Sequence, residues 1–204
     1  MGLLKKYILI VFLSICAAVP ESAADVSTHS FANCGFPDTG QAVCYNATVQ
    51  SACPVTGFPG QDAEYASSAA RLRYTMYVPV AGSSVTVDDL TGLMWVSTGS
   101  NNGGTANWTT ALTSCENSVY AGYSDWRLPN LKELHSIVNY GASAAPYIDG
   151  NAFPNTVSGY WSSTVRVSFS TGALYVDFNS AGMIYHSIKT LNGLRVRCVR
   201  GGPP

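Results

Sequence analysis

The segment Gly122-Tyr-Ser-Asp-Trp-Arg-Leu-Pro-Asn-Leu-Lys-Glu-Leu-His135 combines a polar, aromatic turn with the start of a helix. Asn130 can cap that helix, and Glu133, three residues later, can bond back to the capping residue, as in a capping box. The residues at helical spacing that would form its apolar face are Leu131, Leu134 and Val138. The sequence therefore predicts a capped amphipathic helix immediately after the turn.

The turn itself is too polar for a plain connector, since it holds Asp125, Trp126 and Arg127 in succession. In one interpretation Asp125 and Arg127 lock the turn, by pairing with buried backbone or with each other. In the other they contact a ligand directly. We favour the first, and the residues that we expect to determine the fold are Asp125, Trp126, Arg127, Pro129 and Trp161.

The first residues have the pattern of an export signal. Lys5 and Lys6 precede an apolar run over residues 7–18, and Ser22-Ala-Ala24 is a small-residue cleavage site. The run is shorter than the ~20 residues that span a bilayer, so we expect no stable membrane insertion. An alternative is a lipid anchor on Cys16, although the bulky Ile15 before it argues against one. We expect an exported protein that is periplasmic, on the cell surface or secreted.

Three regions follow from this pattern: a signal peptide over 1–24, a Cys/Pro/Gly-rich extension over 25–70, and one domain over 71–204. Only 11% of the residues are charged, which is typical of extracellular proteins rich in strands and turns. The formal net charge of −1 excludes a generally basic surface and gives no support to nucleic-acid binding. From Tyr160 onward, however, Asp177 is the single acidic residue, against Arg166, Lys189, Arg195, Arg197 and Arg200. Binding of a polyanion therefore stays open.

The cysteines predict disulfides, because an exported protein meets an oxidising environment. None of their spacings matches a zinc site, so we expect no metal. Cys44 and Cys53 can close a short loop, although Cys34 could take Cys44 instead. Cys115 lies on the inner face of a helix predicted from residue 107, capped by Asn107, and its natural partner is Cys198 on the last strand.

The rest of the domain reads as strands and turns. The alternation of residue types predicts strands at 71–79, 85–87, 93–96, 160–164, 173–178, 183–186 and 194–199. A polar loop is expected at 97–106 and a long, functional one at 141–159. On the last strand Arg195 and Arg197 alternate with Val196 and Cys198, so both should leave the core face and pair with Asp residues or with carbonyl groups.

Several of these motifs together resemble the Lcl C-terminal domain family of bacterial surface and secreted proteins. They are Val87-Asp-Asp-Leu-Thr-Gly-Leu-Met-Trp95, the Trp108 to Cys115 helix, Ala121 to Leu134, Phe153-Pro-Asn-Thr156, Tyr160-Trp-Ser-Ser-Thr164 and Val196-Arg-Cys-Val-Arg-Gly201. The resemblance implies an α+β, C-type-lectin-like fold with two helices flanking a small twisted antiparallel sheet, termini near each other, and the Cys115–Cys198 bridge. The family's namesake is an adhesin that binds sulfated glycosaminoglycans, but its collagen-like stalk has no counterpart here.

We therefore expect a ligand-binding module for a polysaccharide or glycosaminoglycan, acting in surface adhesion. The candidate binding residues are Arg166, Tyr175, Asp177, Tyr185, His186 and Lys189. Aromatic rings suit sugar stacking, and cations beside them suit sulfate pairing. For each residue the alternative is a solvated strand face with tyrosines present for their β propensity.

Two other functions are weighed against this one. We expect no catalytic residue and no cofactor, since Cys198 leaves no second late cysteine for an oxidase and no Gly-x-Ser-x-Gly turn is present. Calcium-dependent binding is disfavoured because the long loop offers only Asp149, Asn151 and Asn155. The remaining alternative is a structural or assembly subunit of an envelope, pilus or matrix complex, with the extension docking to a protein partner, for example through Cys34.

Overall fold

The computed structural model describes residues 39–65, 74–98 and 104–201. These residues form eleven strands in three sheets, three short α-helices and one 3-10 turn, η1 at Phe178–Ser180. The prediction of two helices flanking a small sheet is wrong, because most of the regular structure is β. The longest helix has nine residues, and Gly, Pro and Asn interrupt the chain too often for longer ones. The predicted signal peptide, Cys16 and Cys34 lie outside the described residues.

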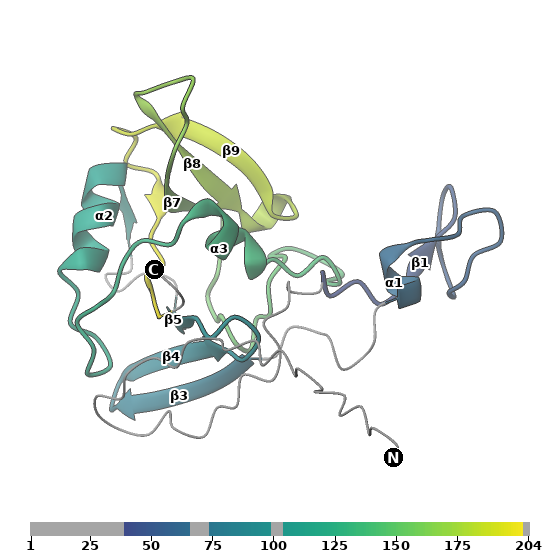
Figure 1. The fold of residues 1–204 in the computed structure, drawn as a ribbon, viewed down its shortest axis with the longest axis horizontal. Helices are drawn as coiled ribbons and strands as arrows, with labels where there is room; N and C mark the ends of the chain where they lie inside the picture. The colour runs from purple at the N-terminus through teal and green to yellow at the C-terminus, as the bar shows by residue number, and fades with distance from the viewer. Residues whose placement is uncertain (1–38, 66–73, 99–103, 202–204) are drawn as a thin grey trace, which may run out of the picture.

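One antiparallel sheet lies at the bottom of Figure 1. Its strands, in spatial order, are β11 Val199–Arg200, β5 Met94–Val96, β4 Ser83–Asp88 and β3 Tyr74–Val80. The predicted hairpin is confirmed, with Val85 opposite Val96 and Val87 opposite Met94. Val85, Val87 and Met94 all contribute to one buried cluster, while Thr86 and Trp95 on the other face of these strands are fully buried as well.

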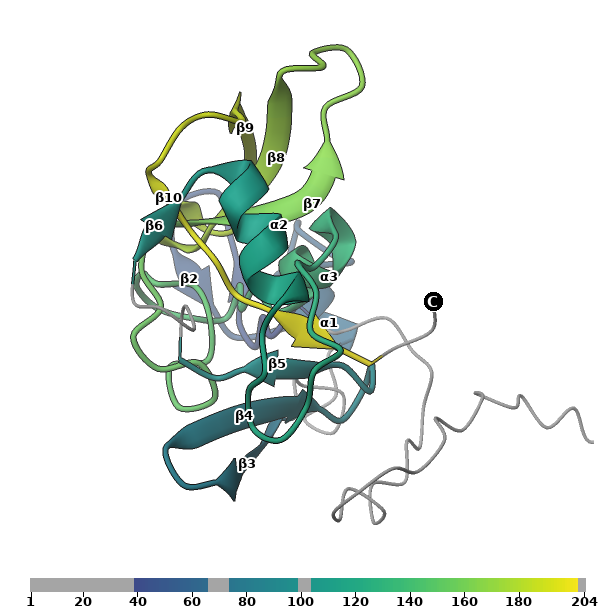
Figure 2. The same ribbon diagram turned by 90° about the vertical axis from the view of Figure 1, so that its left-hand side faces the viewer.

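The second sheet lies at the top of Figure 1 and extends the molecule away from the first (Figures 1 and 2). Its order is β6 Thr105–Ala106, β10 Leu194–Arg195, β7 Gly159–Val165, β8 Gly172–Asp177 and β9 Met183–Ile188. All neighbours are antiparallel except β10 and β7, which run parallel. β9 is therefore an edge strand.

Two separate cores fill the space on either side of this second sheet. Helix α2, Trp108–Glu116, contributes Ala111 and Cys115 to a cluster that contains Trp161 of β7. Helix α3, Leu131–Ser136, contributes Leu134 to a cluster that contains Tyr160, the neighbour of Trp161. Since successive residues of a strand point to opposite faces, the two clusters lie on opposite sides of β7.

The stretch that begins at Gly122 has the predicted helix start. The Asn130 side chain accepts the backbone N–H of Glu133, and a Glu133 carboxylate oxygen accepts the backbone N–H of Asn130, which confirms the capping box. Asp125 and Arg127 do not pair with each other. Arg127 makes a bidentate ion pair with Glu133, at 2.7 Å for both bonds, and Asp125 pairs with Arg200. The turn is thus tied both to its own helix and to the C-terminal strand.

Three apolar residues also hold this region in place. Trp126 is buried and donates its indole N–H to the Tyr120 carbonyl, while the Pro129 carbonyl accepts the backbone N–H of Ser163 on β7. Trp161 is buried as well, and its indole N–H bonds the Ala106 carbonyl at 2.9 Å. The indoles of Trp126 and Trp161 therefore both have the hydrogen-bond partner that burial requires.

The Asp125–Arg200 pair predicts a pH effect on stability. The hydrogen bond from Arg200 holds the pKa of Asp125 below its usual value, so the pair stabilises the fold above the unfolded-state pKa of about 3.9 and is lost as pH falls below it. Because the Asp125 side chain is 59% exposed, the contribution is below about 1 kcal/mol. Urea denaturation at several pH values should show Asp125→Asn destabilised near pH 6, and the difference from the parent should shrink as pH falls below about 4 and through the lowered pKa of Asp125. A constant difference would contradict this assignment.

The predicted strand over 194–199 is divided between the two large sheets. Residues 194–195 form β10 and residues 199–200 form β11, while Val96 N–H bonds the Cys198 carbonyl between them. The expected pairing of Arg197 with carbonyl groups is confirmed, at Val96 and Ser97, but the expectation that it leaves the core is wrong, because it is fully buried. Its side chain lies on the face opposite Val196 and Cys198, and that face packs against Phe153 and Tyr160 of the other core.

Both disulfides that the helix face and loop spacing favoured are present. Cys44 bonds Cys53 in the extension, and Cys115 bonds Cys198 between α2 and the C-terminal segment. The extension contains β1 Cys44–Tyr45, β2 Gln50–Ser51 and α1 Asp62–Tyr65, and it projects from the body in Figure 1. Across the described ranges, every helix is too short or too polar to cross a bilayer.

Candidate ligand-binding surface

An aromatic row crosses the second sheet from its core to its edge. Trp161 on β7 lies opposite Tyr175 on β8, which lies opposite Tyr185 on β9. The ring centroids are 6.1 Å apart for the first pair and 5.6 Å for the second. Burial decreases along the row, from fully buried Trp161 through half-buried Tyr175 to Tyr185, which is 40% exposed.

Tyr175, in the middle of this row, has a neutral hydroxyl group. Burial raises the pKa of Tyr175, and the nearby Asp177 and Tyr185 raise it further. The Tyr175 phenol therefore stays protonated at physiological pH and can donate a hydrogen bond. Tyr175 and Tyr185 together offer a half-exposed aromatic surface with polar rims.

Lys189 lies at the end of the same sheet face, just after β9. Its ammonium group is 4.7 Å from the ring centroid of Trp108 on α2, and it donates to the Ser170 carbonyl at 2.8 Å. The backbone of Lys189 also bonds Thr171 and Trp108. An ammonium group has three N–H donors, so the one bond to Ser170 leaves donors for a ligand.

Arg166 and His186 form a hydrogen-bonded pair on the opposite face of the sheet. His186 is opposite Leu174 in the register, so it points away from Tyr185, and its Nε2 lies in hydrogen-bond contact with an Arg166 guanidinium nitrogen. Phe169 in the β7–β8 loop packs edge-on against His186, at 6.0 Å between ring centroids. The guanidinium also lies 6.0 Å from the Phe169 ring centroid and bonds Ser168.

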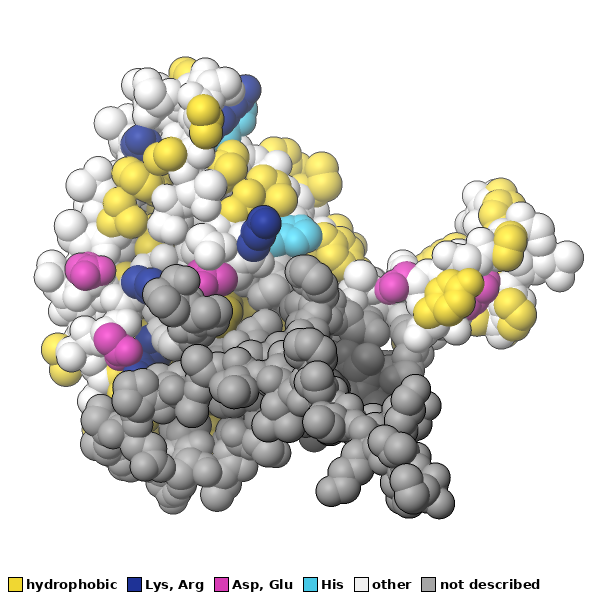
Figure 3. All heavy atoms as spheres, viewed as in Figure 1, with side chains coloured by type: hydrophobic (Ala, Val, Ile, Leu, Met, Phe, Trp, Pro, Cys, Tyr) yellow, Lys and Arg dark blue, Asp and Glu magenta, His cyan; other side chains and the backbone are white. Residues whose placement is uncertain are grey.

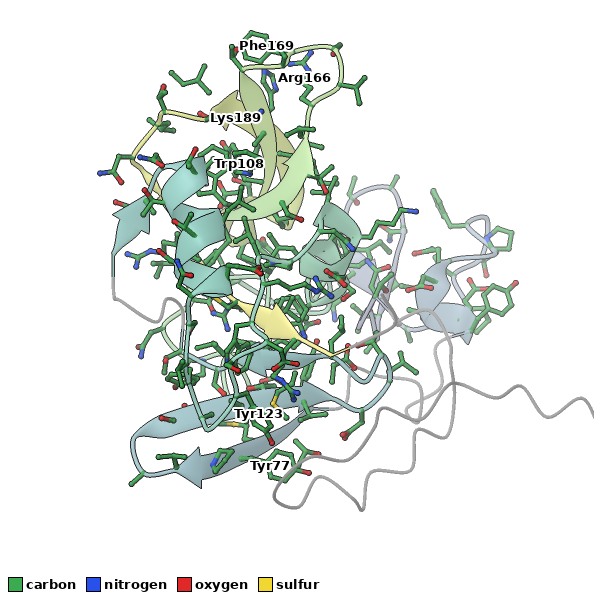
Figure 4. The ribbon with its side chains drawn as sticks, turned by 60° about the vertical axis from the view of Figure 1, so that its left-hand side comes forward. Tyr77, Trp108, Tyr123, Arg166, Phe169 and Lys189 are labelled. Atoms are coloured by element: carbon green, nitrogen blue, oxygen red, sulfur yellow. A yellow bond between two sulfur atoms is a disulfide. The ribbon has the colours of Figure 1, made fainter. Side chains whose placement is uncertain are left out.

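The two groups lie on opposite faces at one end of the sheet, where Lys189 bonds Ser170 and Arg166 bonds Ser168 of the same β7–β8 loop, and together we call them the sheet-end surface. It consists of Trp108, Arg166, Phe169, His186 and Lys189. Figure 4 shows Arg166 and Phe169 at the tip, with Lys189 and Trp108 below them. Cationic and histidine side chains lie at the top of Figure 3, where no acidic side chain is visible.

Asp177 does not belong to this surface. It ends β8 at the end opposite the β7–β8 loop, and its carboxylate accepts the backbone N–H of Asn179 and the Ser180 hydroxyl in turn η1. Its carboxylate is therefore used to form a turn. Residues 159–190 contain no other acidic residue, so these strands and loops bring no negative charge to the sheet-end surface.

The long loop and the histidine of α3 show only structural contacts. Asp149 accepts the backbone N–H groups of Asn151 and Ala152, as a turn residue does. In the described ranges no three His, Cys, Asp or Glu side chains are grouped to hold a metal ion. His135 is half-buried, with its pKa lowered by burial, and its Nε2 contacts the Tyr140 hydroxyl at 3.0 Å.

A protein-family model, the Lcl C-terminal domain, matches residues 84–200. The chain belongs to the Lcl C-terminal domain family. This Lcl C-terminal domain includes β4 and every later element, with the whole sheet-end surface, whereas the extension lies outside the match. Neither the curated proteins nor the solved structures gave a match to the chain.

Sequence reasoning missed two members of the sheet-end surface of the Lcl C-terminal domain. Trp108 was read only as an inward residue of its helix, yet it is half-buried and its ring also contacts Lys189. Phe169 lies in a loop, where strand or helix periodicity carries no information. An aromatic residue in an otherwise polar Ser/Thr segment was the one available signal.

Proposed function

We propose that this protein is an exported, non-enzymatic binding module that recognises a sulfated polysaccharide in surface adhesion, through the sheet-end surface. The observation that carries the proposal is the presence of two cations, Arg166 and Lys189, at one end of the sheet without a carboxylate, with His186 hydrogen-bonded to Arg166. A cationic cluster with no internal counter-ion attracts an anionic polymer. The two disulfides support a protein made for an oxidising compartment.

The chemistry of the surface fits sulfate groups on a sugar chain. Guanidinium and ammonium groups form short, strong hydrogen bonds with anionic oxygens. Trp108 and Phe169 beside them, and Tyr175 and Tyr185 along the sheet, provide ring faces and edges for sugar carbons. Because Lys189 and Arg166 lie on opposite faces of the sheet, a polymer that crosses the β7–β8 loop would meet both.

Charge-removing variants test this proposal. Arg166→Ala and Lys189→Ala should each weaken binding to immobilised heparin by about tenfold, since a charge-assisted hydrogen bond contributes about 1.5 kcal/mol or more. The matched control is Lys132→Ala, which removes one exposed cation from α3 and should change affinity less than twofold. Surface plasmon resonance with the chain from Asp25 would measure all four proteins.

Two outcomes would contradict the proposal. One is the absence of binding to heparin at low salt by a correctly folded protein. The other is an equal loss of affinity in Lys132→Ala, which would mean that only net charge matters.

A second candidate function is a structural or assembly subunit of an envelope, pilus or matrix complex. The observation in its favour is the projecting extension, whose exposed apolar side chains are Tyr45, Val49, Phe58 and Tyr65. Such side chains suit docking to a protein partner. Failure of heparin binding would make this candidate the better one.

A further inference from the structure

The edge strands of the two large sheets differ in how they are protected from pairing with another chain. A sheet edge presents unpaired backbone N–H and C=O groups, and proteins usually protect it by shortness, proline, a bulge or charge. β6 and β11 contain two residues each. β3 contains Pro79, and its register with β4 shifts between Tyr77 and Val80. Three of the four edges are therefore protected.

β9 has none of these protections. Its six residues, Met183-Ile-Tyr-His-Ser-Ile188, pair with β8 in one continuous register. The strand contains no proline, glycine, lysine, arginine or carboxylate. Four of its side chains are apolar or aromatic and exposed, at 54% for Met183, 44% for Ile184, 40% for Tyr185 and 50% for Ile188. β8 is the one strand that pairs with β9 in the described parts of the chain.

We propose that β9 pairs with the β9 strand of a second copy, antiparallel, about a twofold axis at Tyr185. The outer edge of β9 offers backbone groups for such a ladder, and the strand presents the same apolar side chains to its own copy. A twofold axis makes the contact close after two copies, so the result is a dimer.

The register follows from the charges near β9. In an antiparallel pair, residues opposite each other share a face, so the symmetric registers centre on Tyr185 or on His186. Centring on His186 would place the two His186 rings opposite each other and bring the two Arg166 guanidinium groups close together, which is unfavourable because their like charges repel. Centring on Tyr185 instead places His186 opposite Ile184 of the second copy. It also joins the two aromatic rows through a central pair of Tyr185 rings.

The dimer would be weak and reversible. Six residues of strand extend about 20 Å, and an edge contact of that length buries less than the ~800 Å² per partner of a standard stable interface. In the dimer the two copies of Lys189 lie towards opposite ends, because the β9 strands run antiparallel, whereas His186 of each copy lies beside the axis. Two such surfaces would increase avidity for a polymer, although the dimer itself does not depend on the ligand.

Sedimentation velocity of the chain from Asp25, over about 10 µM to about 1 mM, tests the dimer. The parent protein should shift from monomer to dimer across this range. Ile184→Lys places a charge on the proposed edge and should raise the dissociation constant at least tenfold. The matched control is Met76→Lys on the protected edge strand β3, at 47% exposure, which should leave it unchanged.

A monomeric parent at every concentration would overturn the proposal, and so would an equal effect of Met76→Lys. Oxidative cross-linking tests the register in a Cys34→Ser background. Tyr185→Cys, on the axis, should give a covalent dimer, whereas His186→Cys should not, because the two copies of residue 186 would be beyond disulfide reach. Efficient cross-linking of His186→Cys and none of Tyr185→Cys would overturn the Tyr185 register.

Discussion

Replacing Cys115 and Cys198 together with alanine should lower the free energy of unfolding by about 4.5 kcal/mol. The bridge closes 83 residues of sequence separation, so its loss frees much of the unfolded chain. Both cysteines are buried in the core that contains Trp161 and Ala111. Since a domain is typically stable by only 5–15 kcal/mol, this variant should be close to unfolded at 37 °C.

Removal of the other disulfide is the matched control for this prediction. Cys44 and Cys53 are nine residues apart, so the same entropy model gives about 2.7 kcal/mol for their bridge. That loss should be confined to the extension, which lies outside the family match. Urea denaturation followed by tryptophan fluorescence would measure both variants. A larger effect from the Cys44–Cys53 bridge on the domain transition would contradict the assigned roles.

The second large effect is expected at Arg197, the fully buried arginine. Its guanidinium donates to the carbonyls of Val96 and Ser97 and to the Thr156 hydroxyl, at 2.7–3.2 Å. It lies between the rings of Phe153 and Tyr160, with centroid distances of 4.9 and 5.2 Å. Burial lowers its pKa, opposed by Tyr160 and Tyr74, and no carboxylate pairs with it within the described ranges.

Arg197→Ala should therefore destabilise the protein by about 3–5 kcal/mol, because it leaves a cavity and buried acceptors without donors. Arg195→Ala, two residues away at a half-buried position, is the control and should cost less than about 1 kcal/mol. Chemical denaturation monitored by circular dichroism separates the two. Equal effects would show that the guanidinium contacts do not hold the two sheets together.

Local features of this fold could be predicted from sequence. The Asn130 and Asn107 caps depend on residues within a single helical turn, and the 85–96 hairpin depends on one short connection. The Cys115–Cys198 bridge could be predicted because helical spacing places Cys115 inward with Ala111. Each of these involves a short-range pattern or a residue with one clear partner.

The division into sheets could not be predicted in this way. Alternation along 194–199 assumes one buried face and one solvated face. Here Val196 and Cys198 face one core while Arg197 faces the other, so both faces are buried. Because arginine is usually exposed, sequence reasoning placed Arg197 outside the core. Its carbonyl partners lie about 100 residues earlier in the chain, so a local pattern could not identify them.

The candidate site was predicted in part for the same reason. Alternation correctly separated Tyr175 from Leu174 and Val176, but the register between β8 and β9 depends on the turn at η1. That register pairs Tyr175 with Tyr185 and sends His186 to the other face, towards Arg166. Asp177 has a carboxylate suited to a ligand, yet local turn bonds use it.

The measurement that tests the proposed function most directly is the salt dependence of binding to heparin, compared with chemically desulfated heparin. If the sheet-end cations pair with sulfate groups, affinity for heparin should fall about tenfold between 50 and 200 mM salt, as counterion release by about two charge contacts requires. Desulfated heparin should bind at least tenfold more weakly at low salt. Equal, salt-independent binding to both polymers would contradict recognition of sulfate by Arg166, His186 and Lys189.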